Sequence, residues 1–450
     1  MKKRYMNQLF LFAGIILLAS CKPELDVPSP DKGSLDVSKY VSIGNSITSG
    51  FADAALYYNG QVVAYPNLVA EQFKTIGGGN FNQAYVPVGS VGLGSSLNAR
   101  YMLGYKTDCK GVSSLSPGPI APSGDPSIFL TSVAAQGPFN NIGIPGAKAI
   151  TTVYPGYGNP ANGLGKYNPF FTRMLNSSEY ATASMLSKAA EQNATFFSLF
   201  IGNNDVLGFA SSGGTSDAIT PSAGSPGVGF DASIDAIIGT MTSNGAKGVI
   251  GNVPDVTSLP YFTTIPYNGL TLDATQAAQL TAAYTALGIT FTAGSNAFII
   301  QDNTAPGGMR KIKSNELVLL NTPQDSLKCA GWGSQKPLAN MYVLTEAEIN
   351  LIQAAVSAYN AKLRAVANAK GLAYVDVNQF MATVKKGIAY NGITLNTTFV
   401  SGGAFSLDGV HLTPRGNAML ANEFIKSINS TYGSTIPQVD VTKYGGVLFP

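Results

Sequence analysis

The sequence is poor in the residue types on which metal and nucleotide chemistry depends. It contains one histidine, one tryptophan and three cysteines in 450 residues. One histidine with two cysteines outside the N-terminal segment cannot make an ordinary zinc site. The chain also lacks a Gly-x-x-x-x-Gly-Lys-Ser/Thr phosphate loop, and Gly92-Leu93-Gly94 lacks the third glycine of a dinucleotide fingerprint. We therefore expect no metal and no other cofactor.

The N-terminus has the pattern of a bacterial lipoprotein signal. Three basic residues within the first four positions precede an apolar run over 9–18, which is too short to span a membrane. Leu18-Ala19-Ser20-Cys21 resembles the lipobox, whose cysteine is lipidated and becomes the new N-terminus. We expect a signal peptide over 1–20, a lipid anchor at Cys21 and a place in the cell envelope, on the outer membrane, facing the periplasm or the surface. An ordinary secretory signal is the alternative.

Little net charge remains once this segment is removed. Only 12% of the residues are charged, and residues 1–20 carry three basic residues and no acidic one, so 28 Lys and Arg against 25 Asp and Glu become 25 against 25. No basic run with interleaved aromatic residues is left. We expect no nucleic-acid partner.

Two cysteines remain after Cys21. In an oxidising envelope compartment Cys109 and Cys329 often would form a disulfide bond, and two separate buried thiols are the alternative. Residues 22–37 combine charge, proline and glycine without apolar periodicity. We therefore predict a tether over 21–38 and a single folded domain over 39–450.

Short apolar segments alternate with segments of helical periodicity. The expected strands cover 40–43, 195–201, 248–253 and 373–377, and the expected helices cover 178–192, 231–243 and 345–370. The alternation predicts an α/β fold, a three-layer α/β/α sandwich around a mainly parallel sheet. In such sheets ligands bind at the carboxyl ends of the strands.

Two stretches break this alternation, at about 51–135 and 254–344. Both are rich in Gly, Pro, Ser, Thr and Asn but contain apolar runs, so we interpret them as folded insertions. Each follows a strand that leads to the expected ligand-binding edge, which predicts that they shape a substrate cleft. A bond between Cys109 and Cys329 would join them beside that cleft, and a brace remote from the site is the alternative.

The single histidine lies in the run Asp408-Gly409-Val410-His411. Thr413 can cap a helix whose first residue is Pro414, which leaves His411 on the preceding loop. Asp408 lies three residues earlier, a spacing that lets its carboxylate accept a hydrogen bond from the imidazole. The pair predicts a general base with an orienting acid, and a structural histidine is the alternative.

Three other loops carry polar or glycine residues where chemistry is expected. Ser46 follows the first strand at a strand-to-helix turn, where helix N–H groups can stabilise negative charge. Asn203, Asn204 and Asp205 follow a later strand, and the loop 141–147 contains glycines whose N–H groups can approach a ligand. Each motif alone is also compatible with a simple turn.

The order of these motifs is more specific than any one of them. A Gly-x-Ser after the first strand, a glycine loop, a Gly-x-Asn-Asp and an Asp-x-x-His before the last helix resemble the SGNH hydrolases, also called the GDSL esterase/lipase family. The resemblance runs in order from about residue 40 to 430. It implies the α/β/α sandwich with a flavodoxin-like core.

The resemblance also implies a role for each matching residue. Ser46 would attack an ester carbonyl, His411 would take and return its proton, and Asp408 would hold the imidazole. The oxyanion would be met by the N–H groups of Ser46 and Gly146 and by the side-chain amide of Asn204. Gly143 is the alternative to Gly146.

The serine motif departs from the family pattern, because Asn45 and Ile47 replace its Asp and Leu. This puts the support of the loop in doubt more than the chemistry. An α/β-hydrolase elbow would need glycine where Thr48 stands, and the chymotrypsin order is excluded because the only histidine follows Ser46.

These patterns predict a serine hydrolase that cleaves carboxylic esters, on a lipid or an acylated glycan, through an acyl-enzyme. The alternative is a non-catalytic surface lipoprotein that binds glycans with the same fold. Its expected partners are the ester substrate and, through Cys21, a membrane. The sequence does not define an oligomeric state.

Overall fold

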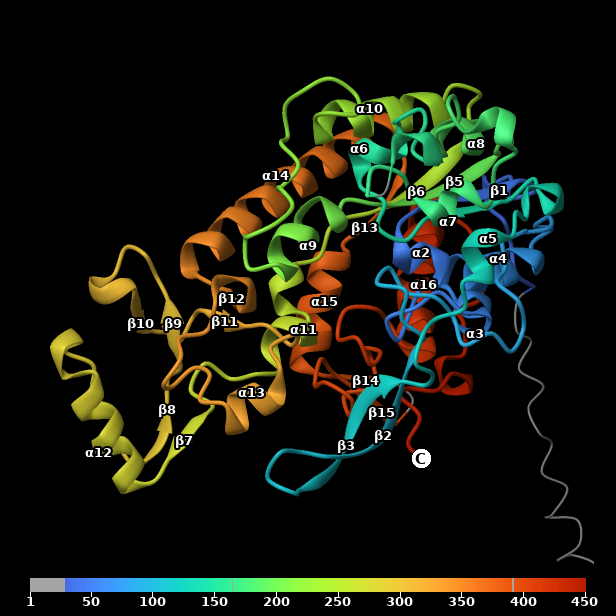
Figure 1. The fold of residues 1–450 in the computed structure, drawn as a ribbon. Coiled ribbons are helices and arrows are strands. Elements are labelled where there is room, and N and C mark those ends of the chain that lie inside the picture. Colours follow the sequence, from blue (N-terminus) through green and yellow to red (C-terminus); the bar gives the residue numbers. More distant parts are fainter. Residues whose placement is uncertain (1–28, 164, 391) are drawn as a thin grey trace, which may run out of the picture.

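The computed structural model describes residues 29–163, 165–390 and 392–450, so the signal peptide and Cys21 lie outside the described residues. At its centre is a sheet of five parallel strands in the order β13-β6-β5-β1-β4 (Figure 1). The strands are β1 (Tyr40–Gly44), β4 (Asn141–Gly143), β5 (Phe196–Phe200), β6 (Lys247–Gly251) and β13 (Ala373–Val375). The predicted α/β fold with a mainly parallel sheet is confirmed.

The strand order places a topological switch beside β1. Along the chain, β4 adds to one side of β1, and β5, β6 and β13 then add to the other side. Ser42 is in register with Asn141 on one neighbour and with Ser198 on the other. Loops that leave β1 and β5 therefore diverge at their carboxyl ends and open a crevice there, which is where ligands bind in such sheets.

Helices cover both faces of the sheet. On one face, α16 contacts β6 and β13, and α4 packs against α16. On the other face, α8 contacts β1 and β4, and α14 contacts β6 and β13. On this second face α10 packs on α6, α8 and α14. These helices are α4 (Tyr65–Lys74), α6 (Ala149–Thr152), α8 (Met185–Ala190), α10 (Phe230–Met241), α14 (Glu346–Lys370) and α16 (Pro414–Tyr432). α14 begins with a capping box formed by Thr345 and Glu348.

Two local predictions were wrong. The helix expected over 178–192 is a 3-10 turn at Ser177–Glu179 followed by α8, because the Ser184 side chain caps a new helix start by accepting from the Ser187 N–H. The loop expected over 141–147 begins with the edge strand β4, whose three residues are too few to show the two-residue period of a strand.

The predicted tether was wrong in its second half. Leu35 and Val37 are buried, and the Ser34 N–H donates to the Tyr432 carbonyl at the end of α16. Lys247 also donates to the Ser34 carbonyl. The ordered domain thus begins before residue 39, because two apolar side chains among charged neighbours are enough to attach the segment.

The first predicted insertion, about 51–135, is largely part of the main body. It contains α4, whose Tyr65 is fully buried with its ring 4.7 Å from that of Phe424 on α16. Only the hairpin of β2 (Tyr101–Thr107) and β3 (Ser113–Pro119) projects from it (Figure 1). The apolar residues of α4 belong to the core of the sandwich, so this stretch is only partly an insertion.

The second predicted insertion has a hydrophobic core of its own. Thirteen buried residues between Leu270 and Val343 form a cluster separate from the main core. We call residues 265–343 the outer lobe; it lies beside the sandwich and carries α12 (Figure 1). Its elements are β7 (Leu270–Leu272), α12 (Ala274–Ala283), β8 (Gly294–Asn296), β9 (Ile299–Gln301), β10 (Met309–Lys311), β11 (Leu317–Val318), α13 (Gln324–Cys329) and β12 (Val343–Leu344).

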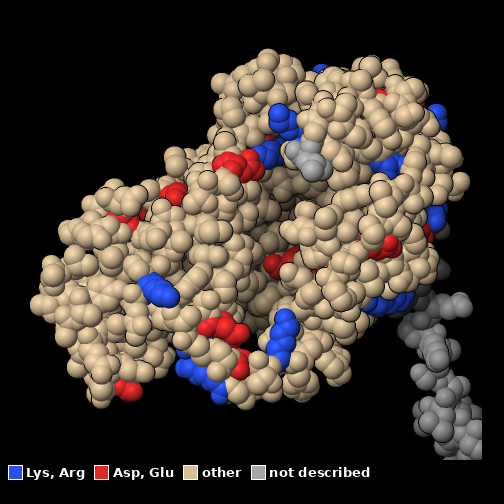
Figure 2. Space-filling view, in the orientation of Figure 1, with Lys and Arg blue, Asp and Glu red and all other residues tan. Residues whose placement is uncertain are grey.

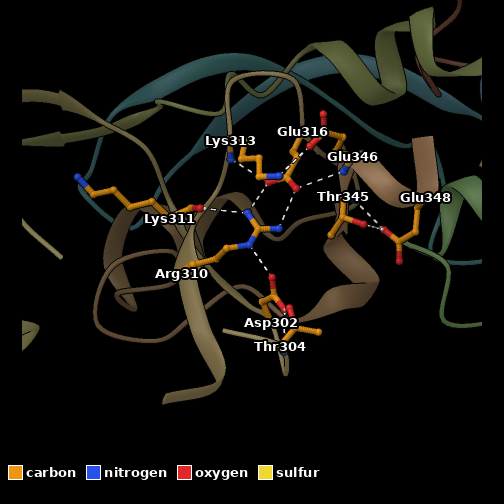
Figure 3. A network of polar contacts seen from close by, with 9 residues as sticks. All are labelled: Asp302, Thr304, Arg310, Lys311, Lys313, Glu316, Thr345, Glu346 and Glu348. Atoms are coloured by element: carbon orange, nitrogen blue, oxygen red, sulfur yellow. Dashed lines mark hydrogen bonds and ion pairs between the residues drawn. The ribbon is translucent and has the colours of Figure 1, made fainter. Parts of the chain in front are cut away.

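A polar network joins the outer lobe to the N-terminus of α14 (Figure 3). The Arg310 guanidinium donates two hydrogen bonds, of 2.6 and 2.8 Å, to the buried Glu316 carboxylate, and a third to Asp302. Glu316 in turn accepts from the Glu346 N–H, and Lys313 pairs with the Glu346 carboxylate at 2.7 Å. Because Glu346 is the first residue of α14, these contacts fix the lobe to a helix of the main body.

The remaining elements are short. They are α2 (Ser46–Ser49), α3 (Tyr58–Val62), α5 (Ser127–Leu130), α7 (Pro169–Thr172), α9 (Asn204–Ser211), α11 (Pro260–Thr263), α15 (Val377–Lys386), β14 (Ile388–Tyr390) and β15 (Ile393–Leu395). Within the described part of the chain, no helix has both the length and the apolar character needed to cross a bilayer.

Candidate active site

Ser46 is the first residue of α2, directly after β1. The Asn45 side chain accepts from the Ile47 N–H at 3.1 Å and caps this short helix. Asn45 therefore performs the local role that an aspartate could perform, and the departure from the family motif leaves the turn supported. Gly44 is required before it, because a Cβ there would lie 2.0 Å from Thr48 Oγ1 and 2.6 Å from the Phe200 carbonyl oxygen.

The structure brings Ser46, His411 and Asp408 together in a hydrogen-bonded chain. His411 Nε2 lies 2.8 Å from Ser46 Oγ, and His411 Nδ1 lies 2.8 Å from Asp408 Oδ2. The three side chains come from the turn after β1 and from the loop before α16, as the sequence indicates. The arrangement can move a proton from the serine hydroxyl to the imidazole while the carboxylate holds the ring.

Asp408 is surrounded by hydrogen-bond donors. Its Oδ1 accepts from the N–H groups of Val410 and His411 at 2.8 Å and from the Ser406 hydroxyl at 3.1 Å, and its Oδ2 accepts from the Ala54 N–H at 2.8 Å. Burial by itself would raise the pKa of Asp408, but the interaction with His411 and the hydrogen bonds from His411 and Ala54 outweigh it and hold that pKa well below its usual value. The carboxylate is therefore charged when it faces the imidazole.

The candidate oxyanion donors come from three segments, which follow β1, β4 and β5. The N–H groups of Ser46 and Gly146 donate to no other group in the described part of the chain, so both are free to bind a ligand oxygen. One hydrogen of the Asn204 amide is taken by the Ala147 carbonyl at 2.9 Å. The alternative donor, Gly143, lies in β4 and its N–H donates to Asn141 Oδ1 at 2.9 Å. The geometry therefore favours Gly146 over Gly143.

A buried carboxylate anchors the loop that carries Gly146. Asp205 Oδ2 accepts from the Ala149 N–H at 2.8 Å, so Asn204 and Asp205, adjacent at the start of α9, both bind the segment 147–149. The other oxygen, Asp205 Oδ1, is buried without a partner in the structure. Burial raises the pKa of Asp205 to about 6. Hydrogen bonds to the carboxylate and the positive charge of Lys148 act in the opposite direction but are weaker than the effect of burial.

A deep cleft of about 1990 Å³ leads to His411 from between the main body and the outer lobe. The hairpin of β2 and β3, the outer lobe and the loop of Asp408 all line it, and the space-filling view shows the hollow between the two parts of the molecule (Figure 2). A second cavity, of about 40 Å³, also reaches His411 and is lined by Ser46 and Asn204. His411 lines both.

Cys109 and Cys329 are joined by a disulfide bond across the mouth of the cleft. The bond connects the turn of the β2–β3 hairpin to the end of α13 in the outer lobe. Beside it, Lys328 forms an ion pair with Asp108 at 2.9 Å, and the Cys109 N–H donates to the Asp325 side chain. The pairing considered from the sequence is thus present, and it ties the two predicted insertions together beside the cleft. Trp332, in contrast, packs against Tyr342 within the lobe and does not line the cleft.

Comparison with known proteins identifies the family of the chain. The model of the GDSL-like Lipase/Acylhydrolase family matches residues 40–424. The chain belongs to this family. The resemblance drawn from the sequence motifs is thereby confirmed, and the protein is a GDSL-like hydrolase.

Two solved structures are similar to this GDSL-like hydrolase. One is a putative GDSL-like lipase from Parabacteroides merdae, with a TM-score of 0.33 and 10% identity over 89% of this chain and 99% of that one. The other is an extracellular lipase from Streptomyces rimosus, with a TM-score of 0.33 and 13% identity over 87% of this chain and 98% of that one. No curated protein matches the chain.

Sequence reasoning missed the residues that support Asp408. Asp53 and Ala54 have left-handed φ angles of 51° and 64°, a conformation that aims the Ala54 N–H at the carboxylate. Asp53 accepts from the Leu407 N–H at 3.0 Å, and its own N–H donates to Ser406. No sequence signal marks Ala54, since alanine, unlike glycine, asparagine or aspartate, rarely adopts this conformation. Within the described residues, no group of three or more potential metal ligands occurs in this hydrolase.

Proposed function

We propose that this hydrolase cleaves carboxylic esters through an acyl-enzyme formed on Ser46. The observation that carries the proposal is the pair of 2.8 Å contacts that link Ser46 Oγ, His411 and Asp408 Oδ2. Ser46 would attack the carbonyl carbon while His411 takes its proton and then returns it to the leaving alcohol. Water, activated by the same imidazole, would release the acid. The N–H groups of Ser46 and Gly146 and the Asn204 amide would hold the oxyanion.

The test is hydrolysis of 4-nitrophenyl acetate by the wild type and by Ser46→Ala, His411→Ala and Asp408→Asn. We expect kcat to fall by about 10⁴-fold or more in the first two variants and by a similar or smaller factor in the third. Gly143→Ala is no useful control, because its Cβ would lie 2.5 Å from the Ser49 nitrogen. Leu351→Ala, an exposed position on α14, is the matched control. Activity retained in His411→Ala would disprove the mechanism.

We also propose that the chain is anchored to the envelope by a lipid on Cys21. The proposal rests on the sequence Leu18-Ala19-Ser20-Cys21 after the basic and apolar segments. Intact-mass measurement of the protein extracted with detergent should give a mature chain that starts at Cys21 and carries acyl chains. The Cys21→Ser variant should appear in the soluble fraction, and a wild type found there without acyl chains would contradict the proposal.

A further inference from the structure

The two cavities that meet at His411 define two sides of the bound ester. The imidazole passes its proton to the leaving alcohol, so the alcohol must lie on the side of His411 that is open to it. The oxyanion donors hold the acyl carbonyl, so the acyl group must lie on the side of Ser46 and Asn204. Only the 40 Å³ cavity touches these two residues, whereas the large cleft touches His411 and Asp408 without them. The small cavity is therefore the acyl side and the large cleft is the alcohol side.

The acyl side is short and apolar. Besides the site residues it is walled mainly by hydrophobic side chains such as Leu207, Phe380 and Met381. A cavity needs roughly 10–15 Å³ of such space for one water, so a volume of about 40 Å³ accommodates only a few non-hydrogen atoms. An acetyl group or one slightly longer fits, and a fatty acyl chain does not.

The alcohol side is large and has many uncharged polar groups. Its volume of about 1990 Å³ exceeds the roughly 300–1,000 Å³ of pockets that bind drug-sized molecules. Its lining includes the amide side chains of Asn321 and Gln335 and aromatic residues such as Tyr101 and Tyr261. Amides can hydrogen-bond sugar hydroxyls and aromatic faces can pack on sugar rings, whereas two alkyl chains would leave these amides unpaired.

The charged groups of this cleft are only partly compensated. Lys328 pairs with Asp108, but Lys106, Lys110 and Lys336 line the cleft without a carboxylate partner in the described part of the chain. On the body side, the charge of Asp408 faces His411. Unpaired lysines and polar side chains suit a hydrated alcohol rich in hydroxyl groups, such as a glycan, better than two alkyl chains.

We propose that the substrate is a glycan of several sugar residues that carries short acyl esters, acetyl above all. This assignment rests on the proposed function and specifies its substrate class. In the first step the Ser46 Oγ–carbon bond forms and the ester C–O bond breaks, while the serine proton passes through His411 to the sugar oxygen. Water then adds to the acyl carbon, and the short carboxylic acid and Ser46 are released.

The acyl side is tested with 4-nitrophenyl acetate, butyrate and octanoate. In the wild type we expect kcat/KM to fall by about 100-fold from acetate to octanoate, since chain atoms that the cavity cannot hold stay outside it. Leu207→Ala should reduce this ratio about tenfold, and Leu207→Phe should make butyrate a poorer substrate. Leu351→Ala is the matched control for the leucine change. Equal or better hydrolysis of octanoate by the wild type would overturn the proposal while leaving ester hydrolysis intact.

The alcohol side is tested with O-acetylated oligosaccharides of two, four and six residues. We expect kcat/KM to rise with the number of sugars in the wild type. Asn321→Trp, which narrows the cleft, should remove this rise, whereas exposed Leu351→Trp should change neither this rise nor the hydrolysis of 4-nitrophenyl acetate. Melting curves establish that each variant folds. No dependence on sugar number, or a preference for emulsified long-chain triacylglycerol, would overturn the proposal; no hydrolysis of any ester would instead disprove the proposed function.

Discussion

The two stretches that look alike in the sequence differ in how they are attached to the fold. Both are rich in glycine, proline and small polar residues, yet the first shares the main hydrophobic core and the second has a core of its own. The first also supplies the Ala54 N–H that binds Asp408. In the second stretch the Tyr261 N–H donates to the Gly409 carbonyl at 2.9 Å and so contacts the triad loop, whereas the outer lobe itself, within the described residues, makes no hydrogen bond to the three triad residues and lines the cleft. The difference suggests that the first stretch is needed for the chemistry and the outer lobe for the choice of substrate.

The main body and the outer lobe each contain a buried carboxylate, and the pKa values of the two are shifted in opposite directions. Asp205 in the main body has one oxygen without a partner, and burial raises its pKa to about 6. For Glu316 in the outer lobe, burial also opposes the charge, but hydrogen bonds from Arg310 and from backbone N–H groups outweigh it and lower the pKa. One part thus carries an uncompensated acid beside the oxyanion loop, and the other a compensated acid at its junction with α14.

The largest expected effect is the loss of a shared core side chain in the first stretch. Tyr65→Ala removes a fully buried ring that packs on Phe200 and Phe424. We expect the free energy of unfolding of the main body to fall by about 3–5 kcal/mol. Denaturant unfolding followed by tyrosine fluorescence and by esterase activity should show both signals shifting together. An activity midpoint that does not move would show that this stretch is separable from the body.

The matched change in the outer lobe should act locally. Phe298→Ala removes a buried ring from the separate core, at a cost of about 3 kcal/mol to the lobe. Hydrogen exchange should rise over 265–343 and stay unchanged in the strands of the central sheet. Hydrolysis of 4-nitrophenyl acetate should continue, while activity on acetylated hexasaccharide falls. Uniform acceleration of exchange across the chain would show that the two cores unfold as one.

The two buried acids should give opposite pH dependences. When the pKa of an acid is higher in the folded state than in the unfolded state, the folded state holds the proton more tightly. The stability that this adds is fully present at pH values below the unfolded-state pKa and is lost as pH rises through the folded-state pKa. Relative to wild type, Asp205→Asn should therefore gain about 2 kcal/mol as pH rises from about 4 to 7. A lowered pKa contributes stability above the unfolded value, so Glu316→Gln should lose stability relative to wild type over the same rise. Parallel pH trends in denaturant unfolding would contradict the contrast.

Much of the fold could be predicted because buried parallel strands read as apolar runs. Tyr40–Gly44 and Phe196–Phe200 are buried on both faces of the sheet, and both sequences are almost continuously apolar. The attachment of the two insertions could not be predicted, since composition does not reveal which core a side chain joins. Tyr65 and Phe298 are equally apolar in the sequence.

The candidate site could be predicted where its residues have uncommon chemistry or spacing. His411 is unique in the chain and lies three residues after Asp408, and each of the motifs around Ser46 and Asn204 follows a strand. The supporting residues could not be predicted, because they act through backbone N–H groups. The role of Ala54 depends on a left-handed turn that no glycine marks.

The smallest expected effect tests whether the first stretch positions the triad. The Asp53 carboxylate accepts hydrogen bonds from the Leu407 N–H and the Tyr57 hydroxyl. In the same turn, the Ala54 N–H donates to the Asp408 carboxylate. Asp53→Ala should lower kcat about tenfold on 4-nitrophenyl acetate with little change in KM, because the carboxylate of Asp408 loses its fixed orientation. Asp53→Asn keeps the acceptor for Leu407 and should restore most of the activity. Asp273→Ala, which removes a helix cap in the outer lobe, is the matched control and should leave kcat unchanged. A tenfold loss in that control as well would mean that the outer lobe supports the chemistry too, and the division between the two parts would be wrong.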